Sequence, residues 1–253
     1  GLYFTGIGIA LASSDLISRY FLINYSWMEA WIALSICGTI LAFYPLYILS
    51  FDKVVKSKQE KHPFDKRLFT PFVILLIFAY FTEGVGFVIQ GTFLPTIIKS
   101  IDGMQEYATL SWLFVGIAGI PSSIIWMRLA YRFGSVNMII IAMLLQVIGI
   151  LLPTMFSNIY SSILSGVLYG VTFVGLVALF MNFGGKISHK NPVMLMGALT
   201  TAYGIGQVFA PLYAVTLTER FGSYDYALYL SAIIVFIGVI ALFFAKKSKS
   251  YIF

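Results

Sequence analysis

The chain has 253 residues, of which 60% are hydrophobic and only 10% are charged. An average soluble domain is about 25% charged, so this composition excludes a water-soluble fold and predicts a membrane protein. The net charge of +6 does not indicate a nucleic-acid partner, because the basic residues lie in the gaps between apolar runs. A single cysteine, Cys37, excludes a multi-cysteine metal site, and we expect no metal and no cofactor.

Eight apolar runs follow one another along the chain, and a membrane-spanning helix needs about 20 such residues. The runs are continuous rather than alternating, which favours helices over barrel strands. We therefore expect an all-α membrane protein with eight transmembrane helices, at Leu2–Tyr20, Trp27–Phe51, Phe69–Ile98, Tyr107–Met127, Val136–Phe156, Ile159–Phe183, Pro192–Leu217 and Tyr226–Ala245.

The spacing of the runs predicts the domain organisation. Residues 1–51 hold two helices, and residues 69–245 hold six helices that we expect to form one bundle. The polar, basic stretch 52–68 is expected to be a cytoplasmic linker attracted to anionic lipid headgroups, and residues 246–253 a cytoplasmic tail. The chain begins at Gly1 with no signal peptide, so we expect it to be the downstream part of a longer protein.

Basic residues are distributed unevenly between the two ends of the predicted helices. Thirteen of the sixteen Lys and Arg residues lie in gaps on one side, whereas Arg19, Lys99 and Arg220 lie on the other. By the positive-inside rule the first side is cytoplasmic, which predicts a multi-pass protein of the inner membrane with both ends of the chain in the cytoplasm.

Asp15 and Arg19 lie four residues apart near the outer end of the first predicted helix. This spacing places both side chains on one face, where opposite charges can pair. We expect an ion pair at the rim of the protein rather than a contact with substrate.

The third run contains an ionisable residue, Glu83, about fourteen residues or 20 Å from its start at 1.5 Å per residue. A charged carboxylate at that depth costs several kcal/mol, so an ionisable residue there is by default a functional candidate. Gln90 shares its helix face, and nearby glycines allow a second helix to approach closely. The alternative is a structural glutamate that is hydrogen-bonded to a neighbouring helix.

Polar residues also occur at helical spacing in the sixth and seventh runs. Their depths are similar to that of Glu83, which predicts a shared substrate-binding site made of Gln90, Tyr169, Thr172, Thr200, Tyr203 and Gln207. Tyr80, Phe87 and Phe173 would supply its apolar walls. The alternative for each polar residue is an ordinary interhelical hydrogen bond, worth about 0.6 kcal/mol. The fifth and eighth runs are mostly apolar and are expected to face lipid.

An internal repeat links the ends of the fourth and seventh runs. Arg132–Phe133–Gly134–Ser135 recurs as Arg220–Phe221–Gly222–Ser223, 88 residues later. The offset spans three helices, so the two copies would face opposite sides of the membrane. Inverted repeats of this kind are typical of secondary transporters.

Three segments carry a family resemblance: Glu83–Gly84–Val85–Gly86–Phe87, Gly91–Thr92–Phe93–Leu94–Pro95, and Tyr203–Gly204–Ile205–Gly206–Gln207 with Pro211. With the Arg132–Phe133–Gly134 turn, they resemble the YbfB/YjiJ-type branch of the major facilitator superfamily over the whole chain. The resemblance implies twelve helices in two six-helix halves. This chain would supply the fifth to twelfth, a bundle lacking its first four helices, and its partners would be those remaining N-terminal helices. The third and sixth helices here would line the cavity.

A cytoplasmic loop of that superfamily carries Gly, three residues, then Asp–Arg–x–Gly–Arg. Arg132 and Gly134 fit this signature, whereas Met127, Tyr131 and Ser135 replace its other members. The resemblance therefore implies a cytoplasmic gating loop at Arg128, Arg132 and Gly134, without the ion pair that the full signature provides.

Together these features predict a secondary active transporter of a small molecule that works by alternating access in the lipid bilayer. We expect proton-coupled efflux with Glu83 as the proton-coupling residue. An uncoupled facilitator, in which Glu83 only binds substrate, and a non-transporting scaffold or receptor stay open. We do not expect an enzyme, because His62 and His189 lie in loops and no metal-binding, nucleophile or phosphate-binding motif occurs. The substrate is not predicted.

Overall fold

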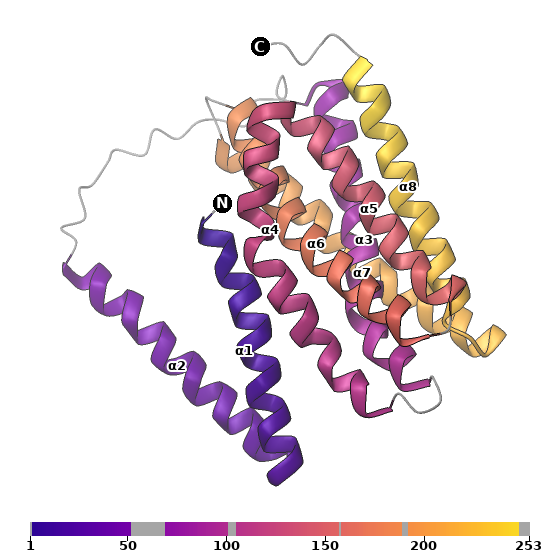
Figure 1. Ribbon diagram of the computed structural model, residues 1–253. Coiled ribbons are helices and arrows are strands. Elements are labelled where there is room, and N and C mark those ends of the chain that lie inside the picture. The colour runs from indigo at the N-terminus through magenta and orange to yellow at the C-terminus, as the bar shows by residue number, and fades with distance from the viewer. Residues whose placement is uncertain (1, 52–68, 101–104, 157, 189–191, 248–253) are drawn as a thin grey trace.

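The computed structural model describes residues 2–51, 69–100, 105–156, 158–188 and 192–247 (Figure 1). Within these ranges the chain forms eight α-helices and one short 3₁₀ helix, η2: α1 Leu2–Asn24, α2 Trp27–Phe51, α3 Pro71–Ser100, η2 Gln105–Leu110, α4 Ser111–Phe133, α5 Ser135–Met155, α6 Ile159–Ile187, α7 Pro192–Phe221 and α8 Asp225–Lys247. The predicted linker at 52–68 and all but the first two residues of the predicted tail lie outside the described residues.

All eight α-helices are long and apolar enough to span a membrane, which confirms the prediction of an all-α protein with eight membrane helices. Several helices extend past the predicted runs: α4 continues six residues beyond Met127, α6 four residues beyond Phe183 and α7 four residues beyond Leu217. Backbone hydrogen bonds continue a helix into polar sequence at the membrane surface, which an apolar run does not mark.

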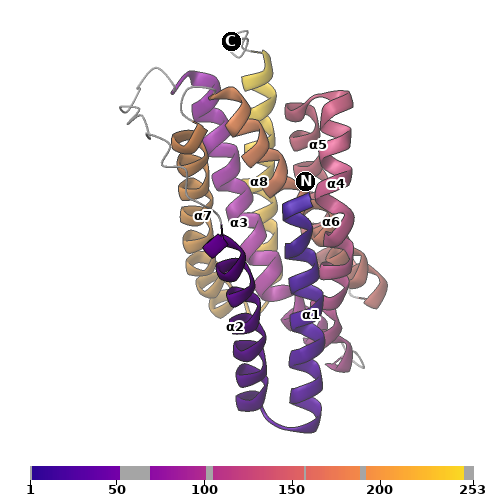
Figure 2. The same cartoon turned by 90° about the vertical axis from the view of Figure 1, so that its left-hand side faces the viewer.

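Helices α3 to α8 pack into one bundle, with α1 and α2 on its outside (Figure 1). The closest pairs are α4 with α6, α3 with α7 and α8, and α5 with α6 and α8. Their apolar side chains form a core between α3, α5, α6 and α8, including Leu76, Met143, Leu176 and Val235. Helix α1 lies along α4, whereas α2 packs mainly on α1 and buries only Ala30 (Figure 2).

Glycines bring three pairs of described helices into backbone contact: α3 with α7, α1 with α4, and α4 with α6 at Gly170. A Cβ atom on Gly84 of α3 would lie 3.0 Å from the carbonyl carbon of Tyr203, and one on Gly206 of α7 would lie 3.1 Å from the nitrogen of Val85. In the second pair, a Cβ on Gly8 of α1 would lie 2.5 Å from the nitrogen of Ile120 in α4. Such close approaches are possible only for residues without a side chain, and they favour association of membrane helices.

The two copies of the repeat end α4 and α7 in the same way, at opposite ends of the bundle (Figure 1). Gly134 has φ +89° and Gly222 has φ +69°, values that L-residues with a side chain rarely adopt. Arg132 lies over the Phe133 ring at 5.3 Å, and Arg220 lies over Phe221 at 5.6 Å. The sequence repeat therefore has a structural counterpart at each turn.

Helices α5 and α8 face lipid on one side only, so the prediction for them was incomplete. Gln146 of α5 and Ser231 of α8 are fully buried, and the Tyr213 hydroxyl lies 2.6 Å from the Ser231 hydroxyl. The opposite faces expose large apolar side chains, such as Ile148 and Phe236. A helix in a bundle must bury one face. In α5 and α8 the isolated polar residues, Gln146 and Ser231, lie on the buried face.

Candidate functional site

Glu83 lies at the centre of the bundle, and none of its surface is exposed. The Gln146 side chain of α5 donates a hydrogen bond from Nε2 to Glu83 Oε1 over 3.4 Å, which is longer than a typical hydrogen bond of about 2.9 Å. Glu83 Oε2 and Gln146 Oε1 have no hydrogen-bond partner in the described part of the chain. A charged carboxylate is costly in this position, because its single partner is a neutral amide.

Three tyrosines from three helices lie close to Glu83 in the bundle. Tyr80 is three residues before it on α3, the Tyr203 backbone of α7 contacts the neighbouring Gly84, and the Tyr169 hydroxyl of α6 bonds to the backbone of Phe87, one turn further along α3. The Tyr80 and Tyr203 rings stack with centroids 4.7 Å apart. The buried Tyr203 hydroxyl has no hydrogen bond to any described residue, although the Gln207 side chain lies near enough to interact with it.

An aromatic cluster continues from these tyrosines along α3 and α6. The Phe87 ring lies 4.5 Å from Phe173 and 5.7 Å from Tyr203, measured between centroids. Tyr169 stacks on Phe173 at 5.7 Å and donates its hydroxyl to the Phe87 carbonyl over 3.2 Å. The structure thus brings together all three residues that were predicted as apolar walls, with Tyr80 at the other side of Tyr203.

Gln90 takes part in a polar network with α5 and α6. Its Nε2 donates to the Ser165 hydroxyl over 2.9 Å and to the Ser165 carbonyl over 3.2 Å, and the Ser165 hydroxyl donates to the Gly149 carbonyl over 2.7 Å. Gln90 is buried, and its Oε1 has no partner among the described residues. This arrangement corresponds to the alternative considered for Gln90, a hydrogen bond between helices.

The two predicted threonines donate to backbone carbonyls of their own helices, and Thr200 Oγ1 also donates to Met181 Sδ of α6 over 3.7 Å. Thr172 is buried and donates to the Leu168 carbonyl over 2.7 Å. Thr200 lies on the exposed surface of α7 and donates to the Met196 carbonyl over 2.9 Å. Of the six predicted binding residues, Tyr169 and Tyr203 belong to the aromatic cluster with Phe87 and Phe173, and Gln207 lies one turn after Tyr203 on α7. The substrate-binding role of all six stays a prediction.

Two polar residues of this region were missed by the sequence reasoning. Gln146 is the hydrogen-bond partner of Glu83, and Ser165 is the partner of Gln90. The available signal for Gln146 was an isolated amide in the middle of an apolar run. Ser165 gave no comparable signal, because serine is common in membrane helices.

The predicted gating-loop residues lie at the end of α4. Arg128 lines a cavity of about 610 Å³ together with Leu2 and Tyr131. Arg132 lies over the Phe133 ring, and Gly134 donates its N–H to the Ala130 carbonyl over 2.9 Å, which ends the helix. Their role in gating stays a prediction.

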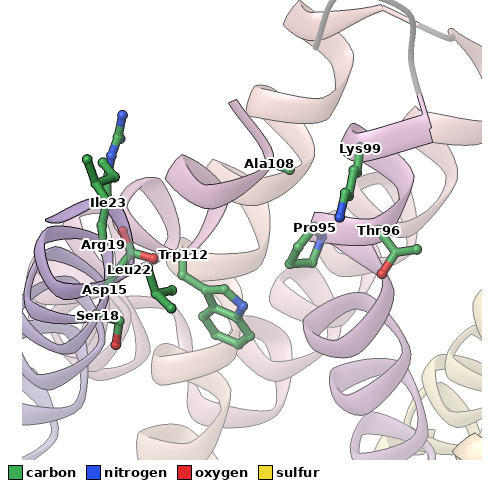
Figure 3. A pocket seen from close by; sticks show the side chains of 10 residues that line it. All are labelled: Asp15, Ser18, Arg19, Leu22, Ile23, Pro95, Thr96, Lys99, Ala108 and Trp112. Carbon is green, nitrogen blue, oxygen red and sulfur yellow. The ribbon is translucent and has the colours of Figure 1, made fainter. Parts of the chain in front are cut away.

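A second cavity, of about 730 Å³, lies where α1 and α3 end (Figure 3). Asp15 and Arg19 line it, but they do not form the predicted ion pair: Asp15 Oδ2 is buried and has no hydrogen-bond partner in the described ranges. Figure 3 shows the guanidinium group extending away from the carboxylate. Long basic side chains near a helix end extend toward the membrane surface and its water, which explains why the four-residue spacing did not produce a pair.

Among curated proteins, no sequence matches the chain at a significant level. The model of one protein family, described as "Uncharacterised MFS-type transporter YbfB", matches residues 1–243. With its eight apolar helices, the chain is a multi-pass membrane protein, and it belongs to the YbfB-type family of major facilitator superfamily transporters.

Proposed function

We propose that the protein is a secondary active transporter that moves a small molecule across the membrane by alternating access, and that proton uptake and release at Glu83 drives efflux. One observation carries the proposal. Glu83 is fully buried at the centre of the bundle, with one long hydrogen bond and one oxygen that has no partner among the described residues. A carboxyl group in that position is neutral when it holds a proton, and after losing it needs a ligand or water as a partner.

Coupling follows from competition for this carboxyl group. In the resting state the proton occupies Glu83, and binding of substrate beside Tyr203 and Gln207 displaces it to water on one side of the membrane. The buried Tyr203 hydroxyl, which has no hydrogen bond to a described residue, is available to orient the substrate. When substrate leaves on the other side, Glu83 takes up a proton again, so one proton enters for each substrate that is exported.

The moving unit is expected to include α3 and α7 together. Their backbones touch at Gly84 and Gly206, which leaves no room for one helix to slide along the other. We propose that they rock as one body with the six-helix bundle against the N-terminal helices, in the inner membrane and with both chain ends in the cytoplasm. The distribution of basic residues supports this orientation.

The test is proton release by the purified intact transporter in weakly buffered detergent solution, followed with a pH-sensitive dye while candidate compounds are added. Wild type is expected to release protons on binding a substrate. Glu83→Gln, which is neutral in both states, is expected to bind without proton release and to lose gradient-driven transport. Glu219→Gln is the matched control, because Glu219 is exposed on α7.

Normal gradient-driven transport by Glu83→Gln would contradict the proposed coupling role. Substrate binding without proton release in the wild type would instead favour an uncoupled facilitator. If no compound is bound or moved by any variant, the scaffold alternative gains support.

A further inference from the structure

The cavity between α1, α3 and α4 is separate from Glu83 and has the size of a small-molecule site. Its volume of about 730 Å³ falls in the range of about 300–1,000 Å³ that is usual for ligand pockets. Asp15 lines it from α1, Lys99 from α3 and Trp112 from α4. Helix α1 and the consecutive helices α3 and α4 therefore form its walls (Figure 3).

Three charged residues line this cavity, and the Arg19 guanidinium group extends away from the Asp15 carboxylate (Figure 3). The Asp15 carboxylate reaches into it from α1, whereas the Lys99 ammonium group reaches into it from α3 (Figure 3). Asp15 Oδ2 is buried with no hydrogen-bond partner within the described ranges. A buried carboxylate oxygen without a partner is unfavourable, and a cationic group held in the cavity beside Asp15 would offset that cost.

The rest of the cavity wall is largely apolar. Leu22 and Ile23 of α1, Pro95 of α3 and the Trp112 indole contribute to it. The Trp112 ring packs edge-on against Tyr169, with centroids 6.1 Å apart. Since Tyr169 belongs to the aromatic cluster around Glu83, the cavity adjoins the proposed transport site through one ring contact.

We propose that this cavity binds a small zwitterion, with a cationic amine at Asp15, a carboxylate at Lys99 and an apolar body between them on Leu22 and Trp112. An anion alone would be repelled by Asp15 and would leave its oxygen without a donor. A cation alone would meet the Lys99 ammonium group. Only a ligand with both charges can place an opposite charge beside Asp15 and beside Lys99. The class of transported substrate inferred here depends on the proposed transport function, whereas the binding site itself does not.

The first test compares three probes of nearly equal size on the intact transporter. Leucyl-leucine carries both charges, its N-acetyl derivative carries only the carboxylate, and its amide carries only the amine. Binding of tritiated leucyl-leucine is measured by scintillation proximity, with the other two as competitors. We expect saturable binding, with each competitor at least tenfold weaker than unlabelled leucyl-leucine. Absence of saturable binding, or equal competition by all three, would overturn the proposal.

Variants that each remove one charge test whether the ligand's amine lies beside Asp15 and its carboxylate beside Lys99. Asp15→Asn is expected to weaken leucyl-leucine binding at least tenfold without weakening binding of the N-acetyl derivative. Lys99→Gln is expected to weaken leucyl-leucine binding at least tenfold as well, without weakening binding of the amide. Glu219→Gln serves as the control, and size-exclusion profiles and unfolding temperatures check that every variant is folded. Unchanged leucyl-leucine binding in both folded variants would place the ligand elsewhere and refute the site.

Glu83→Gln separates this inference from the proposed function. It is expected to keep the discrimination among the three probes that the zwitterion site predicts and to lose proton-coupled transport. If another compound is transported with protons but leucyl-leucine is not bound, the zwitterion site is wrong and the coupling mechanism stands. If the binding results are as expected but Glu83→Gln transports leucyl-leucine normally, the coupling role is wrong and the zwitterion site stands.

Discussion

Gln146 and Glu83, on α5 and α3, are joined by a hydrogen bond of 3.4 Å in the buried centre of the bundle. The bond links two helices through the one carboxyl group that lies in the core of the described bundle. Its energy can be measured in a double-mutant cycle with Gln146→Leu, Glu83→Leu and the double variant, unfolded in mixed micelles. We expect a coupling energy of about 0.6 kcal/mol, the mean for hydrogen bonds between membrane helices. Strict additivity of the two substitutions would show that the bond contributes nothing.

Two tyrosine hydroxyls should respond oppositely to removal. Tyr203→Phe deletes a buried hydroxyl that has no hydrogen bond to a described residue, so stability is expected to stay the same or rise while transport falls. Tyr213→Phe deletes a hydroxyl that lies 2.6 Å from Ser231 Oγ. That change is expected to cost about 1 kcal/mol and to leave transport intact. Unfolding temperature and initial transport rate distinguish the two, and an equal loss of stability in both variants would contradict this reading.

Two glycines of α7, two residues apart, provide a matched test of helix packing. A Cβ on Gly206 would lie 3.1 Å from the Val85 nitrogen and closer still to the Phe81 carbonyl, whereas a Cβ on Gly204 would meet nothing within 4 Å. Gly206→Ala is therefore expected to cost about 1–3 kcal/mol through overpacking. Gly204→Ala is expected to be neutral or slightly stabilising, since alanine is the better helix former. Both are measured by thermal unfolding in detergent, and equal effects would argue against the α3–α7 contact.

The turns after α4 and α7 require glycine for a different reason. Gly134 and Gly222 have φ values of +89° and +69°, where a side chain costs about 1–2 kcal/mol per residue. Gly134→Ala and Gly222→Ala are each expected to lower stability by that amount. Gly197→Ala, at a helical position with open space around it, is the control. A neutral result at both turns would mean that they adopt another conformation.

The fold could largely be predicted from sequence, because a membrane imposes long apolar runs on every helix that crosses it. The ends of α4 and α7 were predicted less well, since their last turns contain polar residues such as Arg132 and Arg220. Depth along the apolar runs also predicted that Tyr169 and Gln207 share a level with Glu83. Hydropathy indicates how deep a residue lies along a helix, and helical spacing indicates on which face it lies. The bilayer constrains both of these properties.

Partners across helices could not be predicted in the same way. Gln146 lies 63 residues from Glu83, and the rotation of α5 that brings it there depends on packing against α6 and α8. Asp15 and Arg19 show the converse, because a favourable spacing did not yield an ion pair once the arginine could extend toward the helix end. Side-chain pairing depends on the whole bundle and on access to water, neither of which a local pattern contains.

The backbone contact between α1 and α4 has a mechanical consequence. Gly8 and Ala12 press against Ile120 and Gly116, and atoms already in contact cannot be compressed. Helix α1 can therefore tilt on α4 only about this point, so that separation at one end accompanies approach at the other. From the middle of the contact the two arms of α1 measure about 12 Å and 21 Å at 1.5 Å per residue. A small displacement at Leu2 would thus be nearly doubled at Asn24, so the part of the cavity that Leu22 and Ile23 line would change its width more than the part beside Asp15.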